Sequence, residues 1–400
     1  MENIIKNNKT PMNNKRILWV NPSFLDYRIP LYAELKKIYN DNFYLIYSKK
    51  RIPERCHSKI IKTLGVKALF LEKEKYLRLK YKYTYANTGV RIPFPTGLYK
   101  RIKESKPDII IAEGFFQFTP WAVWYSFIHR KPLLIAYERT AHTERNCPWW
   151  RKLYRRFIGL FVNGYIANGQ LTKEYLISQG VKPENIFTGG MCADSEGLTK
   201  SITEMTKEEK EAMYTSVVGN KHTGITYIFV GQMIPRKGVK ELLYAWDKHC
   251  KKYTEDKLLL VGNGIQLNEF KENYKDNKSI IFTSDINYSE IYKYYAISDV
   301  FIIPTLEDNW SLVVPEAMAC GLPIACSIYN GCHPELVKKD ENGITFDPIK
   351  QESIIETLAY FHTQDLEKMG KKSIDTEKEY SPRKVATNIK NAIEHYISKK

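Results

Sequence analysis

Two acidic residues, Asp308 and Glu316, follow the apolar run 300–304 and are separated by seven residues. The pattern predicts a buried strand, a polar loop, and a helix that begins near Pro315 with Glu316 in its first turn. In an open α/β sheet, phosphorylated ligands bind where a loop at the carboxyl end of a strand leads into a helix N-terminus. Asp308 and Glu316 would flank such a loop. By themselves, the two carboxylates would also suit the acid and the base of a hydrolase.

A basic pair precedes another predicted helix. A predicted strand over 226–230 runs into Gly231, and Arg236, Lys237 and Gly238 stand directly before a helical pattern. Two cations beside a helix N-terminus suit a diphosphate, because the anion receives both positive charge and backbone N–H groups. The alternative is a solvated basic turn, since Lys-Gly is a common entry to a helix.

A glycine turn ends the next predicted strand. Gly262, Asn263 and Gly264 follow the apolar run 258–261. Leu267 occupies the third glycine position of G-x-G-x-x-G, so the dinucleotide-binding fingerprint is absent. The turn either lies beside a nucleotide base or is a simple connection from strand to helix.

Together these segments resemble the family 4 glycosyltransferases (glycosyl transferases group 1), which are retaining enzymes with the two-domain GT-B fold. The motifs stand in the family's order: Phe229-Val-Gly231, Lys237-Gly238, Val261-Gly-Asn-Gly264, Asp299-Val-Phe-Ile-Ile-Pro304, and Asp308 followed by Glu316-Ala-Met-Ala-Cys-Gly-Leu-Pro323. A weaker resemblance, to the family's first strand and loop, covers residues 21–30. The resemblance implies transfer of a sugar from a nucleotide diphosphate, such as a UDP- or GDP-sugar, to an acceptor.

The resemblance implies roles for both carboxylates. Glu316 matches the residue that binds the donor ribose, and a carboxylate can accept hydrogen bonds from both ribose hydroxyls. Asp308 matches the family's glutamate that contacts the sugar, with a side chain shorter by one methylene. The neighbouring Glu307 is an alternative for that contact.

The resemblance also implies a set of donor-binding groups. Lys237 matches the family's lysine, whereas Gln232 stands where the family has an arginine, so Arg236 is expected to supply the missing charge. The predicted donor-binding residues are Glu316, Arg236, Gly231, Gly262, Asn263, Ser311, Leu312 and Val313, and the last three would bind through their backbone.

A histidine marks the acceptor side. His142 follows the predicted strand 133–137, on a loop directed at the expected cleft, where the family often has a histidine. It is either functional or a surface or structural residue. Glu113-Gly114, after the predicted strand 108–112, is another place where the backbone could approach a ligand. The predicted catalytic residues are Asp308, His142 and Lys237.

Neither a metal nor another cofactor is expected. Cys320, Cys326, Cys332 and His333 lack the close spacing of a zinc site. Asp-x-Asp does not occur in the sequence, so donor binding through a bridging metal is not expected.

Strand-like and helical patterns alternate along the chain, which predicts an α/β fold of two doubly wound Rossmann-like domains with a cleft between them. The predicted strands are 16–21, 43–48, 108–112, 133–137, 165–168, 226–230, 257–261, 280–283, 300–303 and 323–327. The predicted helices are 31–38, 96–105, 171–179, 207–216, 239–252, 289–297, 314–319 and 349–361. The predicted domains are 1–195 on the acceptor side and 224–380 for the nucleotide sugar, joined by a linker at 196–223. A helix in 381–400 would pack back on the first domain.

The net charge of +16 is uneven. Residues 1–195 hold 34 lysines and arginines against 15 acidic residues, whereas the remainder is slightly acidic. This asymmetry indicates an anionic partner for the first half, unless the lysines only decorate a solvated surface. No nucleic-acid motif accompanies the charge. An anionic membrane surface fits better, because the segments 73–82 and 149–156 mix bases with aromatic residues.

The predicted function is that of a retaining glycosyltransferase acting on a glycan or lipid-linked acceptor in cell-surface polysaccharide or lipopolysaccharide synthesis. No apolar run reaches membrane-spanning length, no signal peptide is recognised, and seven unpaired cysteines fit a reducing compartment. A cytoplasmic protein at the inner face of the cell membrane is expected. The alternatives are a nucleotide-sugar epimerase or phosphorylase of the same fold, and a non-catalytic protein that binds polyanions.

Overall fold

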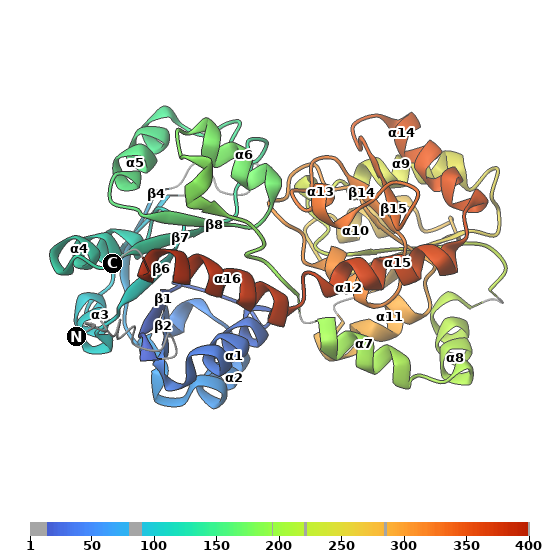
Figure 1. The fold of residues 1–400 in the computed structure, drawn as a ribbon. Helices are drawn as coiled ribbons and strands as arrows, with labels where there is room; N and C mark the ends of the chain where they lie inside the picture. The colour runs from blue at the N-terminus through green and yellow to red at the C-terminus, as the bar shows by residue number, and fades with distance from the viewer. Residues whose placement is uncertain (1–13, 80–89, 194, 220–221, 284–285, 399–400) are drawn as a thin grey trace, which may run out of the picture.

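The computed structural model describes residues 14–79, 90–193, 195–219, 222–283 and 286–398. Figure 1 shows two lobes side by side, formed by the first and second halves of the chain, with the last helix returning to the first lobe. Among the described residues, no helix combines the length and the apolar character needed to cross a bilayer.

The first lobe contains a seven-stranded parallel sheet in the order β3-β2-β1-β6-β7-β8-β9. Its strands are β1 (Ile17–Val20), β2 (Phe43–Ser48), β3 (Ala68–Leu71), β6 (Ile109–Glu113), β7 (Leu133–Tyr137), β8 (Gly164–Ala167) and β9 (Ile186–Phe187). A separate antiparallel hairpin joins β4 (Lys75–Leu79) to β5 (Val90–Phe94). The residues of β1 alternate between two cores: Ile17 and Trp19 join one, and Leu18 and Val20 join the other. Both faces of the sheet are therefore covered.

The second lobe contains a six-stranded parallel sheet in the order β12-β11-β10-β13-β14-β15. Its strands are β10 (Thr226–Val230), β11 (Lys257–Val261), β12 (Ile280–Thr283), β13 (Val300–Ile303), β14 (Ile324–Ser327) and β15 (Gly343–Phe346). In both sheets the strand order reverses beside the first strand, at β1 and β6 and at β10 and β13. This is the doubly wound topology, so the predicted fold class is confirmed.

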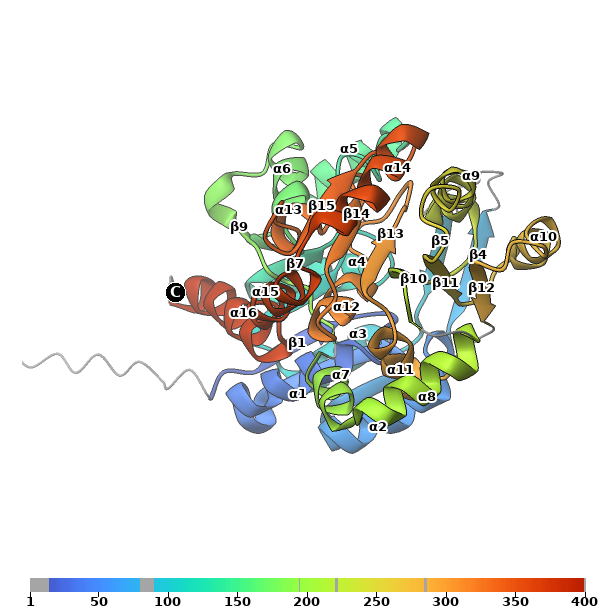
Figure 2. The same cartoon turned by 90° about the vertical axis from the view of Figure 1, so that its right-hand side faces the viewer.

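Helices cover both faces of each sheet (Figures 1 and 2). In the first half they are α1 (Arg28–Tyr39), α2 (Glu54–Leu64), α3 (Leu98–Ser105), α4 (Thr119–His129), α5 (Trp149–Gly159) and α6 (Gln170–Ser178). In the second half they are α7 (Ser195–Glu204), α8 (Lys207–Val218), α9 (Val239–His249), α10 (Leu267–Asn273), α11 (Ile291–Ala296), α12 (Val313–Ala319), α13 (His333–Leu336), α14 (Gln351–Tyr360), α15 (Leu366–Lys378) and α16 (Pro382–Ile397). Figure 2 shows α9 and α14 on one face of the second sheet, and α11, α12 and α15 on the other.

Every predicted strand has a counterpart, but the sequence pattern does not indicate the hairpin strands β4 and β5, nor β3, β9 and β15 of the parallel sheets. The last three strands are at most four residues long and lie at sheet edges. The pattern also does not indicate α2, α4, α5, α7, α10, α13 or α15. In α4 and α5, apolar residues occupy the exposed as well as the buried faces and obscure the helical period.

The segment predicted as a linker contains α7 in addition to α8, the helix predicted at 207–216, and both helices pack against the second domain. Leu198 of α7 and Tyr214 of α8 are buried in the core of that domain. The Tyr214 hydroxyl lies 3.2 Å from the hydroxyl of Thr226 at the start of β10. The charge of this segment suggested a linker, but its few apolar residues are spaced to face the domain.

The last helix crosses back to the first domain. Val385, Ile389 and Ile393 of α16 are fully buried, in the same core as Leu31 and Tyr32 of α1. The preceding helix, α15, packs on α12 of the second domain. The end of the chain therefore ties the two domains together (Figure 1).

Candidate active site

A cavity of about 790 Å³ lies between the two domains. The loops after β10 and β11 and the start of α12 form its wall on the second domain, and the loop after β1 forms its wall on the first. The predicted donor-binding residues Gly231, Gly262, Asn263, Val313 and Glu316 all line it. This is the point of the second sheet where the strand order reverses, which is where α/β proteins bind nucleotides.

The carboxylate of Glu316 is held by two tyrosine hydroxyls at the wall of this cavity. Tyr288 donates to Oε1 at 3.1 Å, and Tyr295 donates to Oε2 at 3.4 Å. Burial, together with the charge of Glu316, raises the pKa of Tyr295 well above its usual value, so Tyr295 remains a donor. Tyr288 also lines the cavity. A carboxylate oriented in this way can accept the two hydroxyls of a ribose.

Asp308 lies between two cations. Its Oδ2 atom is 2.5 Å from Lys237 Nζ and 3.7 Å from a guanidinium nitrogen of Arg236. Burial alone would raise the pKa of the Asp308 carboxyl, but the charge of Lys237 outweighs it and keeps this pKa below its usual value. The Asp308 carboxyl is therefore ionised at neutral pH, and it lies between two basic side chains.

Two glycines allow the loops of this site to touch. Gly238 adopts φ +68°, and a Cβ there would lie 1.9 Å from the Pro304 carbonyl oxygen at the end of β13. Gly262 adopts φ +136°, and a Cβ there would lie 2.1 Å from the Gly231 carbonyl oxygen. Both contacts are with backbone, which cannot move aside, and both φ values favour glycine.

The remaining predicted donor groups stand beside the cavity rather than in its wall. Ser311 is buried, and its backbone N–H donates to the Asn330 side chain at 3.2 Å. Leu312 is the N-cap residue of α12. Arg236, Lys237 and Asp308 are not among the described residues that line the cavity, and Arg236 donates to the Glu307 carbonyl in the loop after β13. The donor-binding and catalytic roles predicted for Arg236, Lys237 and Asp308 stay predictions, as do the roles predicted for the other residues of the site.

His142 reaches across the cleft to the second domain. Its Nε2 lies 2.9 Å from the Leu306 carbonyl oxygen, and its ring stacks on Tyr329 at 4.5 Å. Burial lowers the pKa of His142, so the neutral ring donates from Nε2. Three residues later, Arg145 pairs with Glu307 at 2.7 Å. The predicted catalytic role of His142 stays a prediction, and in this conformation its Nε2 holds the domains together.

A second cavity, of about 310 Å³, lies at the ends of β1, β6 and β7 in the first domain. Tyr27 lines both cavities, so they adjoin. Glu113 is fixed in the second cavity by the Trp19 indole N–H and by Arg28, each at 2.9 Å. Four arginines line this cavity: Arg28, Arg139, Arg151 and Arg155.

Among the described residues, the cysteines considered as metal ligands do not gather with histidine, cysteine or acidic side chains into a group of three or more. Burial raises the pKa of the Cys332 and Cys320 thiols well above the usual value, which keeps them protonated. The Cys332 thiol donates to Asn330 Oδ1 at 3.2 Å.

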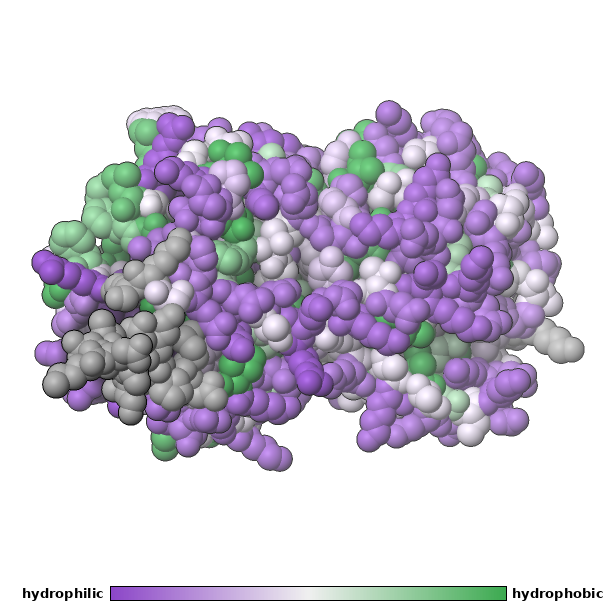
Figure 3. Space-filling view, viewed as in Figure 1, coloured by the Kyte–Doolittle hydropathy of each residue, from purple (hydrophilic) through white to green (hydrophobic). Residues whose placement is uncertain are grey.

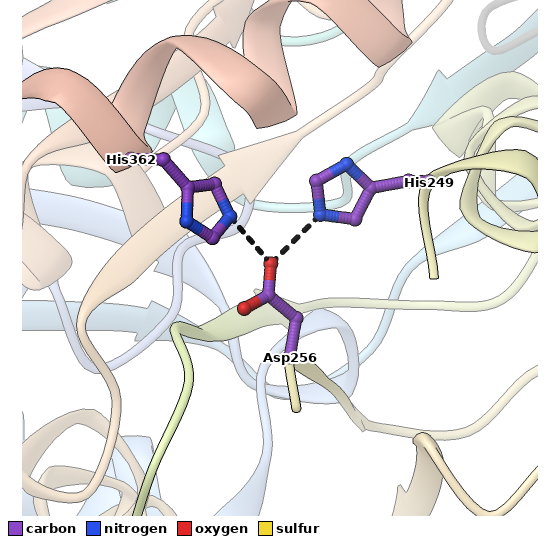
Figure 4. Close-up of side chains that lie close together, drawn as sticks. All are labelled: His249, Asp256 and His362. Atoms are coloured by element: carbon purple, nitrogen blue, oxygen red, sulfur yellow. Dashed lines mark hydrogen bonds and ion pairs between the residues drawn. The ribbon is translucent and has the colours of Figure 1, made fainter. Parts of the chain in front are cut away.

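In the part of the chain that the structure describes, one cluster of two histidines and an aspartate has residue types that bind metals. This cluster lies far from the cavity, at the opposite ends of the strands. Figure 4 shows His249 and His362 directing Nε2 at one oxygen of Asp256, each at 2.8 Å. A histidine that binds a metal through Nε2 donates from Nδ1. Among the described residues, the buried Nδ1 of His249 has no hydrogen-bond partner. The group is better suited to tying α9 to the 3-10 helix 361–363 than to holding a metal.

Comparisons with known proteins agree with this architecture. Residues 214–376 match the family model of glycosyl transferases group 1, and residues 50–188 match that of glycosyltransferase family 4. Two Rossmann-like domains with a cleft between them are the GT-B architecture, and the two family models match one segment in each domain. The chain belongs to the family 4 glycosyltransferases, and the predictions of family and of a transferase enzyme are confirmed.

Curated relatives match part of the chain. An uncharacterised glycosyltransferase of Haemophilus influenzae is 33% identical over 141 residues, which are 33% of this chain and 38% of that protein. An alpha-monoglucosyldiacylglycerol synthase of Acholeplasma laidlawii is 26% identical over 175 residues, 43% of each chain. The chain thus spans about two fifths of the length of these relatives.

Solved structures share the whole fold. The Anabaena protein Alr3699/HepE in complex with UDP superimposes with a TM-score of 0.73 and 15% identity, covering 95% of this chain and 100% of that one. At this identity the likeness shows the fold alone.

Sequence reasoning does not indicate Tyr288, Tyr295 or Arg145. The two tyrosines contact Glu316 from segments more than twenty residues away, and no local pattern marks them. Arg145 could have been found from the sequence, because it stands in the same predicted loop as His142.

Proposed function

We propose that this chain is a retaining, metal-independent glycosyltransferase that moves a sugar from a nucleotide diphosphate to a glycan or lipid-linked acceptor. The carboxylate of Glu316, oriented by two tyrosines at the wall of the interdomain cavity, carries the proposal. The cavity is large enough for a drug-sized ligand, and nucleoside diphosphates are in that range. The complex of Alr3699/HepE with UDP supports the binding of a nucleotide by this fold.

Cleavage of the donor requires that negative charge on the departing diphosphate be stabilised. Lys237 and Arg236 are the proposed source, with Asp308 holding them in position until the sugar takes part of that interaction. Prearranged cations of this kind act most strongly in a site closed to water. Closure of the cleft through His142 and Arg145 would exclude water, which otherwise competes with the acceptor for the sugar. Retention of the anomeric configuration follows from the family resemblance.

The acceptor is proposed to enter through the second cavity, beyond Tyr27. Its arginines favour an acceptor that carries negative charge. The relative from Acholeplasma laidlawii is described as a diacylglycerol glucoside synthase, which supports a lipid acceptor. The excess of basic residues in the first half supports work at the inner face of the cell membrane, in the synthesis of cell-surface glycans or glycolipids.

Thermal stabilisation by nucleotides tests the donor site. UDP or GDP is expected to raise the Tm of the parent, and Glu316→Gln is expected to lose most of that shift because one ribose hydroxyl loses its acceptor. Glu352→Gln, an exposed change on α14, is the matched control and keeps the shift. If Glu316→Gln is stabilised as strongly as the control, the ribose assignment is wrong.

Turnover tests the chemistry. Release of the nucleoside diphosphate should depend on an added lipid or glycan acceptor, should persist in EDTA, and should give a product with the donor's anomeric configuration. Acceptor-independent conversion of the donor would support an epimerase instead, and loss of turnover in EDTA would contradict the metal-independent mechanism.

A further inference from the structure

The outer surface of α4 and α5 is unusually apolar. We call it the α4–α5 apolar face, and it consists of Trp124, Phe127 and Ile128 on α4 and of Trp149, Leu153, Phe157 and Leu160 on or directly after α5. These side chains are 49% to 79% exposed. Figure 3 shows apolar side chains gathered at the outer edge of the first lobe, over these two helices. Contiguous exposed apolar surface of this kind marks an interaction site.

The two helices form one continuous surface. Phe161 packs edge-on against Phe127 of α4 at 5.7 Å and against Phe157 of α5 at 5.5 Å. Along α5, Trp149, Leu153 and Phe157 recur every four residues, so they lie on one side of the helix. The face is therefore built from two adjoining helices rather than from scattered side chains.

The charged side chains on α4 and α5 all have one sign. Neither α4 nor α5 contains an aspartate or a glutamate, whereas α5 carries exposed Lys152 and Arg156 between its apolar residues. An amphipathic helix with tryptophan and phenylalanine on one side and bases beside them is typical of a segment that lies in the interface of an anionic bilayer. A protein partner would require no such excess of positive charge.

The opposite side of α5 faces the second cavity. Arg151 and Arg155 line that cavity, and Arg155 is 5% exposed and donates to Glu144 at 2.7 Å. One helix thus has an apolar outer side and an arginine-bearing inner side. A lipid-anchored acceptor lying against the outer side would have its head group within one helix diameter of the cavity, about 10 Å.

We propose that the α4–α5 apolar face inserts into the interface of an anionic bilayer and sets the second cavity at the height of lipid head groups. The inference rests on the proposed function in so far as the acceptor is lipid-linked, but docking itself needs no turnover. The proposal assigns membrane binding to a defined surface instead of to the basic first half as a whole. On this surface the aromatic side chains enter the bilayer, and Lys152 and Arg156 contact the lipid phosphates.

Sedimentation of the full chain with vesicles tests this surface. Trp124→Ser/Phe157→Ser is expected to reduce binding to phosphatidylglycerol-containing vesicles by at least about tenfold, because two large apolar side chains no longer leave water. Lys152→Ser/Arg156→Ser is expected to reduce binding to these vesicles and to leave binding to pure phosphatidylcholine unchanged. The control is Ile349→Ser, which removes a 68% exposed apolar side chain from the second domain and should bind as the parent does.

Two further measurements keep the outcomes distinct. If Trp124→Ser/Phe157→Ser binds vesicles as the parent does, or if size-exclusion chromatography with light scattering shows that the change instead splits a dimer, the bilayer assignment is overturned. The Tm shift by UDP or GDP should be equal in the parent and in these variants. Absence of that shift in the parent would contradict the proposed function and leave the docking result standing.

Discussion

Lys237 Nζ lies 2.5 Å from Asp308 Oδ2, although 71 positions separate the two residues in the chain. The contact joins the short 3-10 helix 235–237 before α9 to the loop after β13, at the reversal of strand order in the second sheet. Both side chains are 13% exposed, so solvent screens their attraction only in part. One carboxylate therefore holds Lys237 against the loop after β13.

Removal of the Lys237 charge is expected to slow the chemical step more than it weakens the fold. Lys237→Gln should lower kcat by about 10²–10³-fold, the usual loss for one prearranged group that stabilises transition-state charge. The exposed Lys240→Gln on α9 is the control and should retain parent activity. In a double-mutant cycle with Asp308→Asn, the Tm losses should be less than additive, because each single change leaves a partly buried partner unpaired. Additive losses and an unchanged kcat would contradict the pair's role.

The contact between Arg145 and Glu307 is expected to favour the closed cleft. Arg145→Ala leaves the 3% exposed Glu307 carboxylate without this partner. Arg145 itself is 33% exposed, so solvent weakens the pair. We therefore expect the free energy that favours the closed cleft to fall by only about 1 kcal/mol, and the donor KM to rise about fivefold. Small-angle scattering should show a larger radius of gyration. Arg101→Ala, which breaks a surface pair on α3, should change neither quantity.

Gly238→Ala is expected to be far more harmful than Gly219→Ala. Both glycines have left-handed φ values, +68° and +82°, so the conformational cost of an alanine is similar. Only at Gly238 would the new Cβ meet backbone, the Pro304 carbonyl oxygen at 1.9 Å. Urea unfolding should therefore show an additional loss of about 1–3 kcal/mol for Gly238→Ala. Equal losses for the two variants would mean that the loops need not touch.

Glu377 is expected to make stability depend on pH. Burial on α15 raises the pKa of its carboxyl from 4.5 to about 7. The folded state therefore binds the proton more tightly, so the contribution to stability is complete below the unfolded pKa and is lost as the pH rises through about 7. Glu377→Gln should raise the Tm at pH above this value and leave it nearly unchanged in acid. A Tm gain that is the same at both ends of the pH range would contradict the raised pKa, and the exposed Glu352→Gln should show no gain at either end.

Local patterns were sufficient for most strands of the two parallel sheets and for the loops that follow them. An apolar run such as 257–261 predicts a buried strand, and Gly262 directly after it marks where that strand must end at the cleft. In parallel sheets the carboxyl ends of all strands meet at one edge. The convergence of Gly231, Gly262 and Glu316 around one cavity could therefore be expected from the chain alone.

Partners from distant segments could not be expected in the same way. The contact of His142 with the Leu306 carbonyl spans 164 positions, and nothing near His142 encodes that oxygen. In the predicted linker, Leu198 of α7 and Tyr214 of α8 pack on an apolar surface of the second domain. That surface exists only after the second domain has formed. The sequence by itself determined the order of the elements, the family and the residue types at the strand ends. Which side chain faces which, including the tyrosines that orient Glu316 and the two-sided α5, was decided by tertiary packing, since such contacts depend on distances between segments that local periodicity does not contain.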